Sequence, residues 1–165
     1  MRNLVLLFSF LLACASCQMD SQSEVVNTKL IEKYVSAVAN LDYGAMDELL
    51  DDNYVGFGPS HNDSVTKERA LSNWKNNVEN LYKSISFNRS RNLASFVPDG
   101  PNAGNWVSNW SEMTIVYKKD EKQVTLWVNT IYKIDDNKII RSYTFYNEAD
   151  VLEQLGYVFI DPNEL

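Results

Sequence analysis

Few residues in this sequence could carry out acid–base chemistry. His61 is the only histidine, and it lies two residues after Pro59 in the polar segment 60–64. Histidine is the side-chain type that most often acts as a general base near neutral pH, so His61 is the first candidate for this role. A single histidine in a polar loop is also typical of a solvated side chain, and that alternative stays open. Asp51 and Asp52 are adjacent at a predicted helix end, which indicates a solvated cap rather than an acid–base pair.

Aromatic residues alternate with polar ones in two segments and could form a binding surface. Trp127, Asn129 and Ile131 share one face of a predicted strand, as do Trp106, Ser108 and Trp110. If these faces point inward, they predict a pocket for a small apolar or aromatic molecule. The alternatives are a plain core or a sheet contact in a homodimer. The candidate ligand-binding residues are Tyr54, Trp74, Trp106 and Trp127.

The composition argues against several other functions. With one histidine and both cysteines near the N-terminus, no residue cluster has metal-ligand spacing, so neither a metal nor a cofactor is expected. The sequence has no G-x-S-x-G and no phosphate-binding glycine loop. The net charge of −7 would repel a phosphate backbone, so no nucleic-acid partner is expected.

The N-terminus has the pattern of a bacterial export signal. Met1-Arg2-Asn3 precedes the apolar segment 4–13, which is too short to span a bilayer and has the length of a signal-peptide core. It ends in Leu11-Leu12-Ala13-Cys14, which resembles the lipobox of bacterial lipoproteins. Cys17 is the alternative lipid acceptor. An ordinary cleaved signal or a short buried helix would also fit.

These features predict three parts: a lipoprotein signal peptide over 1–13, a lipidated cysteine with its tether over 14–23, and one domain over 24–165. The predicted protein is exported and lipid-anchored to the bacterial cell envelope, at the outer membrane or the periplasmic face. The anchor would then be its contact with the membrane, because an acidic surface does not favour binding to anionic lipids.

Hydrophobic periodicity predicts an α+β domain. Helices are expected over 24–41, 45–50 and from Thr66 to about Leu81, with Thr66 as the N-cap of the third. Strands are expected at 54–57, around 85–87, and over 106–117, 124–134 and 139–146, followed by a helix over 148–155. The segment 157–160 is predicted as a last strand or a dimer contact. This order favours three N-terminal helices on one face of a curved antiparallel sheet.

Two segments carry a family resemblance: YVSAVANLDYGAMDELLDDNYVGFGP, from Tyr34 to Pro59, and KIIRSYTFYNE, from Lys138 to Glu148. In this order they resemble the nuclear transport factor 2-like superfamily, which includes ketosteroid isomerases and SnoaL-like polyketide cyclases. The resemblance implies a cone-shaped domain whose sheet wraps a pocket closed by helices. It also implies that a homodimer often forms through the sheet.

The resemblance also implies roles for individual residues. The isomerases have an aspartate base just before the proline, where this sequence has Gly58. Tyr34 matches their helix tyrosine, which polarises the substrate carbonyl, and Asn129 falls near their protonated aspartate. Two hydrogen-bond donors without a base do not make a proton-transfer enzyme. Tyr34 is also compatible with a core position on an amphipathic helix.

Three functional hypotheses follow from the sequence. The leading one is a membrane-anchored domain that binds a small apolar molecule without catalysis. The second is a cyclase, isomerase or dehydratase that uses His61 with Tyr34 and Asn129 on a small apolar substrate. The third is a dimerisation or protein-interaction module of the cell envelope.

Overall fold

The computed structural model describes residues 21–161 and 163. Cys14, Cys17 and the predicted signal peptide lie outside the described residues. Within the described part of the chain, no helix is long and apolar enough to cross a membrane.

Four α-helices and one π-helical turn are present in the described residues. They are α2 (Ser21–Ala39), α3 (Tyr43–Leu49), α4 (Lys67–Asn76), the π-helical turn η1 (Asn77–Leu81) and α5 (Glu148–Gln154). Side chains at their starts satisfy backbone N–H groups that have no partner within the helix. Asp42 accepts from the N–H of Ala45 at 2.9 Å, and Thr66 accepts from the N–H of Arg69 at 3.4 Å. The cap predicted at Thr66 is therefore confirmed.

The strands form one six-stranded sheet in the order β2-β1-β6-β5-β4-β3. Their bounds are β1 (Leu50–Phe57), β2 (Ser64–Thr66), β3 (Tyr82–Val97), β4 (Gly104–Tyr117), β5 (Gln123–Asp135) and β6 (Lys138–Tyr146). The strands β3 to β6 form the predicted antiparallel meander. The β1 strand pairs with β6 in parallel, so the sheet is mixed at this side. This pairing joins distant parts of the chain, which local periodicity does not specify.

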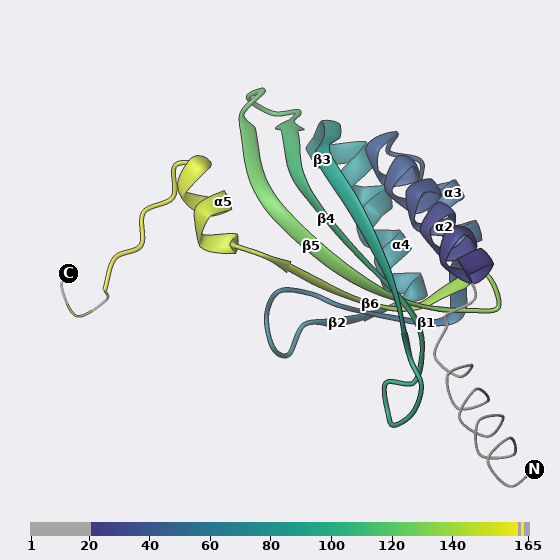
Figure 1. Cartoon of the computed structure of the whole chain (residues 1–165). Coiled ribbons are helices and arrows are strands. Elements are labelled where there is room, and N and C mark those ends of the chain that lie inside the picture. The colour runs from purple at the N-terminus through teal and green to yellow at the C-terminus, as the bar shows by residue number, and fades with distance from the viewer. Residues whose placement is uncertain (1–20, 162, 164–165) are drawn as a thin grey trace, which may run out of the picture.

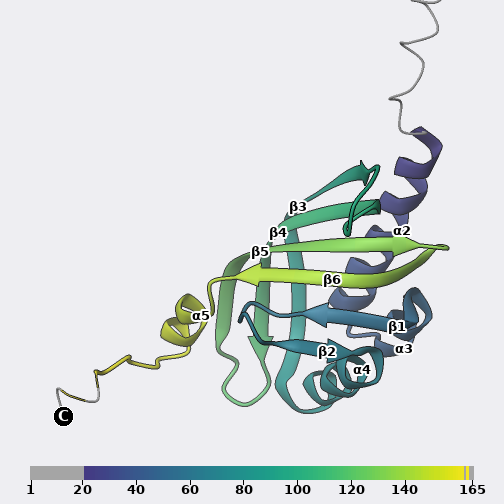
Figure 2. The same cartoon turned by 90° about the horizontal axis from the view of Figure 1, so that it is seen from below.

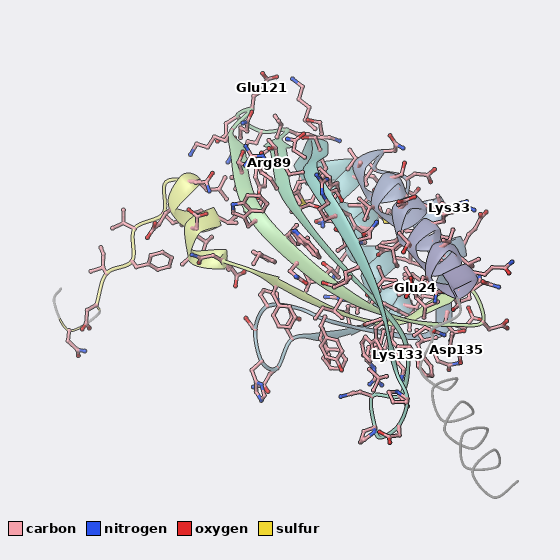
Figure 3. The ribbon with its side chains drawn as sticks, in the orientation of Figure 1. Glu24, Lys33, Arg89, Glu121, Lys133 and Asp135 are labelled. Atoms are coloured by element: carbon pink, nitrogen blue, oxygen red, sulfur yellow. The ribbon has the colours of Figure 1, made fainter. Side chains whose placement is uncertain are left out.

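The sheet curves around the N-terminal helices (Figure 1). Figure 2 shows β6, β1 and β2 as neighbouring strands, with α4 beside β2. The core lies between the helices and the concave face of the sheet, where Ile31, Met46, Leu50 and Ile139 are almost fully buried. Lys33 on the opposite side of α2 points away from the sheet (Figure 3). This arrangement is the predicted α+β fold with helices on one face of a curved sheet.

The two faces of the sheet differ in burial. In β5 the even-numbered residues, such as Val124, Leu126 and Val128, are buried against the helices, whereas Trp127 on the opposite face is 57% exposed. Paired residues of neighbouring strands share a face, so Trp110, Asn129 and Phe145 form a row on the same convex face as Trp127. We call it the outer face.

The chain after α5 extends away from the sheet (Figures 1 and 2). The residues from Tyr157 to Ile160 form no strand, so the strand predicted there is wrong. Their side chains are 56–79% exposed. The apolar run at 157–160 therefore does not extend the sheet, whose edge strands are β2 and β3.

Candidate functional site

A cavity of about 290 Å³ lies between the helices and the concave face of the sheet. Helices α2 and α4, the turn η1 and the helix α5 supply one side of its lining, and strands β1 and β3 to β6 supply the other. Six of the nine tyrosines of the chain line it: Tyr34, Tyr54, Tyr82, Tyr117, Tyr132 and Tyr146. Most of the other lining residues are aliphatic or aromatic, and a cavity of this composition suits a small, largely apolar molecule.

The inner end of the cavity holds three buried tyrosines. The Tyr54 hydroxyl and the Ser142 Oγ are 2.6 Å apart and share a hydrogen bond across β1 and β6. The rings of Tyr34 and Tyr132 meet edge to face, with centroids 5.7 Å apart. Beside them, the hydroxyls of Thr130 and Thr144 are 3.3 Å apart. This end therefore offers hydroxyl groups within an otherwise apolar wall.

The outer end is lined by half-buried aromatic rings. Trp74 on α4 meets Tyr82 on β3 at a centroid distance of 6.4 Å, and Tyr82 meets Tyr117 on β4 at 5.5 Å. Both pairs are close to perpendicular. Tyr146, at the end of β6, completes this group. Since these rings are more exposed than those of the inner end, this is where a ligand would enter.

Burial raises the pKa of every tyrosine that lines the cavity. The pKa of Tyr34 is raised well above its usual value, first by burial and then by the neighbouring phenols of Tyr54 and Tyr132. Burial, with the phenols of Tyr117 and Tyr146, raises the pKa of Tyr82 to about 12. For Tyr54, burial raises the pKa although the hydrogen bond to Ser142 opposes this. At neutral pH all six are therefore uncharged phenols that can donate or accept a hydrogen bond.

No acid or base with a useful pKa lines the cavity. Among the described residues that line it, none is Asp, Glu, Lys, Arg or His. A general base must be largely deprotonated at working pH and within hydrogen-bond reach of its proton. Neutral phenols with raised pKa values do not meet the first condition. The lining can bind and orient a molecule and can polarise a carbonyl by hydrogen bonding.

Asn109 is the most constrained polar group of the lining, with 3% exposure. Its Nδ2 donates to Ser90 Oγ at 2.9 Å and to Asn92 Oδ1 at 2.8 Å, and its Oδ1 accepts from Ser111 Oγ at 3.1 Å. These bonds tie β4 to β3 beside a register shift, where Arg89 has a φ of 51°. A residue with positive φ at a bulge is costly, so the amide helps to hold this bend.

The cavity contains three of the residues predicted for the site. Tyr34, Tyr54 and Trp74 all line it, as a pocket would require. His61 does not line it and is exposed in the loop between β1 and β2.

The predicted inward position of Trp106, Trp127 and Asn129 is wrong, because all three lie on the outer face. Trp106 is buried there by neighbours on its own face: Tyr143 stacks at 6.3 Å and Lys133 Nζ lies 5.5 Å from its ring centroid. Its Nε1 donates to the Asn102 carbonyl at 2.7 Å. A period of two predicts alternation in a strand but does not specify which set of residues faces the helices.

Sequence reasoning missed Asn109 and four tyrosines of the lining, namely Tyr82, Tyr117, Tyr132 and Tyr146. One signal was available for Tyr132, because Val124, Leu126 and Val128 precede it with period two and form the more apolar face of β5. The other three tyrosines lie at strand ends, where periodicity carries little information.

No family model and no curated protein matches the sequence. Solved structures do match. A proposed polyketide cyclase from Xanthomonas campestris pv. campestris has a TM-score of 0.66 and 13% identity, over 81% of this chain and 98% of that chain. A protein of ketosteroid isomerase-like fold from Catenulispora acidiphila, solved in complex with trimethylamine, has a TM-score of 0.60 and 11% identity, over 78% and 93%.

A nuclear transport factor 2-like protein from Cytophaga hutchinsonii matches with a TM-score of 0.52 and 17% identity, over 78% of this chain and 100% of that chain. The chain therefore has the nuclear transport factor 2-like fold, and the resemblance found in the sequence is confirmed at the level of the fold. Because this fold hosts unrelated activities, function has to be argued from the cavity.

No group of three His, Cys, Asp or Glu residues within the described part of the chain could hold a metal ion.

Proposed function

We propose that this domain binds a small, largely apolar or aromatic molecule in its tyrosine-lined cavity and does not transform it. The observation that carries this proposal is the chemistry of the lining: six neutral phenols and no carboxylate, imidazole or amine among the described lining residues. Such a wall can recognise a ring and one or two oxygen atoms, but it has no group that would take up a proton at neutral pH.

The sequence pattern around Cys14 supports a second part of the proposal, in which a lipid anchor holds this domain at the surface of the bacterial cell envelope. The residues between Cys14 and Ser21 would then connect the anchor to α2. A tethered binding domain would retain its ligand near the membrane, where apolar molecules concentrate.

Isothermal titration with a panel of neutral arenes that carry one hydroxyl or carbonyl group, such as 2-naphthol, tests the binding proposal. We expect saturable binding of at least one member at one site per chain. Trp74→Ala should weaken it, because Trp74 lines the cavity. Trp127→Ala is the matched control, since it removes the same ring from the outer face. Absence of saturable binding across the panel by the folded protein would overturn the proposal.

Catalysis is the second candidate function. It is favoured by the similarity in fold to a proposed polyketide cyclase and by the Tyr34 and Tyr54 phenols, which both line the cavity. Two phenols that donate to one carbonyl oxygen could stabilise an enolate while the substrate or water provides the base. This candidate predicts turnover of a small ketone that Tyr34→Phe abolishes while the protein stays folded. Turnover unchanged by Tyr34→Phe would remove it.

The outer face supports a third candidate, self-association. Trp110, Trp127 and Phe145 are 39%, 57% and 51% exposed there, and exposed neighbouring aromatic residues are typical of interfaces. Trp127→Asp should then lower the sedimentation coefficient from that of a dimer to that of a monomer. A wild-type monomer at high concentration would exclude this candidate.

A further inference from the structure

Gly56 lies buried within β1, where a glycine normally weakens a strand because it has no side chain to pack. A positive φ angle would justify a glycine, and Gly100, Gly104 and Gly156 have one, but Gly56 does not. The other reason for a glycine inside a strand is the close approach of another group. Space, and not backbone conformation, therefore accounts for the residue at this position.

The Tyr54 side chain occupies the space that a side chain at position 56 would need. A Cβ atom on Gly56 would lie 2.5 Å from the Tyr54 hydroxyl oxygen and 3.1 Å from the Cζ atom beside it. The two residues are two positions apart and therefore face the same side of β1. The phenol must then lie along the strand with its hydroxyl over Gly56. This is why Tyr54 lines the cavity whereas Gly56, beneath it, does not.

This placement brings the Tyr54 hydroxyl to Ser142. The parallel pairing of β1 with β6 sets Gly56 beside Ser142, so a hydroxyl over Gly56 is within reach of the serine. The two hydroxyl oxygens are 2.6 Å apart, and both residues are buried. A methyl group at position 56 would overlap the phenol oxygen and push it away from this partner. Gly56 therefore positions the pair of hydroxyls.

The Tyr54–Ser142 pair keeps hydrogen-bonding capacity for a ligand. Each hydroxyl has one hydrogen and two lone pairs, and their mutual bond uses only one of the two hydrogens. Neither hydroxyl has another hydrogen-bond partner among the residues that the structure describes. Both residues line the cavity, so an oxygen atom of a bound molecule can accept the remaining hydrogen. A hydrocarbon in the same place would leave that hydrogen unpaired, which costs free energy.

We infer that Gly56 is a positioning residue that sets the specificity of the cavity: by leaving room for the Tyr54 phenol, it holds the Tyr54–Ser142 pair where the pair selects an oxygen-bearing arene over a hydrocarbon of the same shape. The inference rests on the proposed binding function. It adds the class of ligand, an aromatic alcohol or ketone with its oxygen at the inner end, and the residue on which the selection depends. A hydroxyl already held in place loses little freedom when it binds, which favours such a ligand further.

Two probes of the same shape test the inference on the full chain: 2-naphthol and 2-methylnaphthalene, which has a methyl group in place of the hydroxyl. Isothermal titration gives the affinity for 2-naphthol, and competition with 2-naphthol gives that for 2-methylnaphthalene. The ratio of the two affinities is the readout. Tyr54→Phe removes the hydroxyl and should shift this ratio about tenfold toward 2-methylnaphthalene. Gly56→Ala keeps the hydroxyl but displaces it, and should shift the ratio to a similar extent.

The double variant shows whether both changes act through the same hydroxyl. In the Tyr54→Phe background, Gly56→Ala should change the ratio by no more than about twofold, because the hydroxyl that it displaces is absent. Gly44→Ala is the matched control. A Cβ atom on Gly44 would have an ordinary contact of 3.4 Å with Asp42 Oδ1, so this variant should keep the wild-type ratio.

Urea unfolding tests the steric argument without a ligand. Alanine is otherwise favoured over glycine within a strand, yet Gly56→Ala should lower the urea midpoint, because its Cβ atom meets the Tyr54 hydroxyl. The loss should be smaller in the Tyr54→Phe background, which lacks the closest atom. Gly56→Ala protein that is as stable as the wild type would overturn the argument. If Gly56→Ala does not fold, folding of the double variant supports the contact, and failure of both variants overturns it.

The inference and the proposed function can fail separately. A ratio that Tyr54→Phe leaves unchanged overturns the inference, because another hydroxyl of the lining would then hold the ligand oxygen, and leaves the binding function standing. A ratio that responds to Tyr54→Phe but not to Gly56→Ala overturns the role of Gly56. Binding of neither probe rejects the inference, and the rest of the arene panel then decides the proposed function.

Discussion

Replacing Asn109 with aspartate should destabilise the domain strongly at neutral pH. The two side chains have the same shape, so the change exchanges a donor for a charged acceptor without altering packing. The new oxygen would face Asn92 Oδ1, which now accepts from Nδ2 at 2.8 Å, and the Arg91 carbonyl, which accepts at 3.4 Å. Ser90 Oγ can turn its hydrogen toward the new oxygen, and Asn92 could donate to it only after a rotation of its amide by 180°.

The magnitude follows from these contacts. Each lost hydrogen bond costs about 1 kcal/mol, and an unpaired charge at a site with 3% exposure adds desolvation. We expect Asn109→Asp to lower the free energy of unfolding by about 3 kcal/mol or more at pH 7. Burial and the facing oxygens would raise the folded-state pKa of the new carboxyl above its unfolded value of about 3.9. Stability is therefore retained below pH 4 and lost as the pH rises through the folded-state pKa.

Urea unfolding at pH 4 and pH 7 measures this effect. Asn73→Asp is the control, because Asn73 is exposed on α4 and the same charge change should cost little there. If Asn109→Asp stays within about 1 kcal/mol of the wild type at pH 7, the amide does not hold the bend of β3 as described. Equal destabilisation at both pH values would contradict the buried-charge explanation.

Three further predictions concern the cavity, its helix and the anchor. Burial raises the pKa of Tyr82 to about 12, so the contribution of its neutral phenol to the free energy of unfolding should be fully present below about pH 10 and should be lost as the pH rises toward 12. Urea midpoints should therefore fall as phenolate absorbance at 295 nm rises. The Gln154 side chain on α5 accepts from the Thr125 N–H at 2.9 Å and donates to the Thr125 carbonyl at 2.9 Å. Gln154→Ala should therefore weaken the contact of α5 with β5 and speed amide hydrogen exchange in α5 without unfolding the sheet. Cys14→Ala should abolish incorporation of labelled lipid and release the protein from membranes; if only Cys17→Ala does so, the anchor is at Cys17.

The sequence was sufficient for the helices and for the strands β1 and β3 to β6 in their order, but not for the short strand β2. Thr66 is an N-cap with Glu68 in the first turn, and a cap of this kind depends on neighbouring residues alone. The third helix was predicted to continue to Leu81, but the α-helix ends at Asn76 and a π-helical turn follows. Leu81, the last residue of the predicted helix, is 42% exposed.

The site was harder to predict because its residues meet through long-range pairing. The hydrogen bond between Tyr54 and Ser142 joins residues 88 positions apart, through the parallel pairing of β1 with β6. The outward position of Trp127 depends on which face of β5 packs against the helices. Large aromatic residues on the outer face made it resemble a pocket wall, although the smaller Val128 and Thr130 face the cavity.

Native mass spectrometry of the chain, purified gently from the cells that make it, tests the central claim most directly. The account predicts a fraction of the protein with extra mass that dissociates on mild activation, and the same preparation of the Trp74→Ala variant should carry less of it. The released molecule should be a small, largely apolar or aromatic compound. Wild-type protein without any bound molecule, and with no saturable uptake of the arene panel, would contradict the claim that this cavity is a binding site.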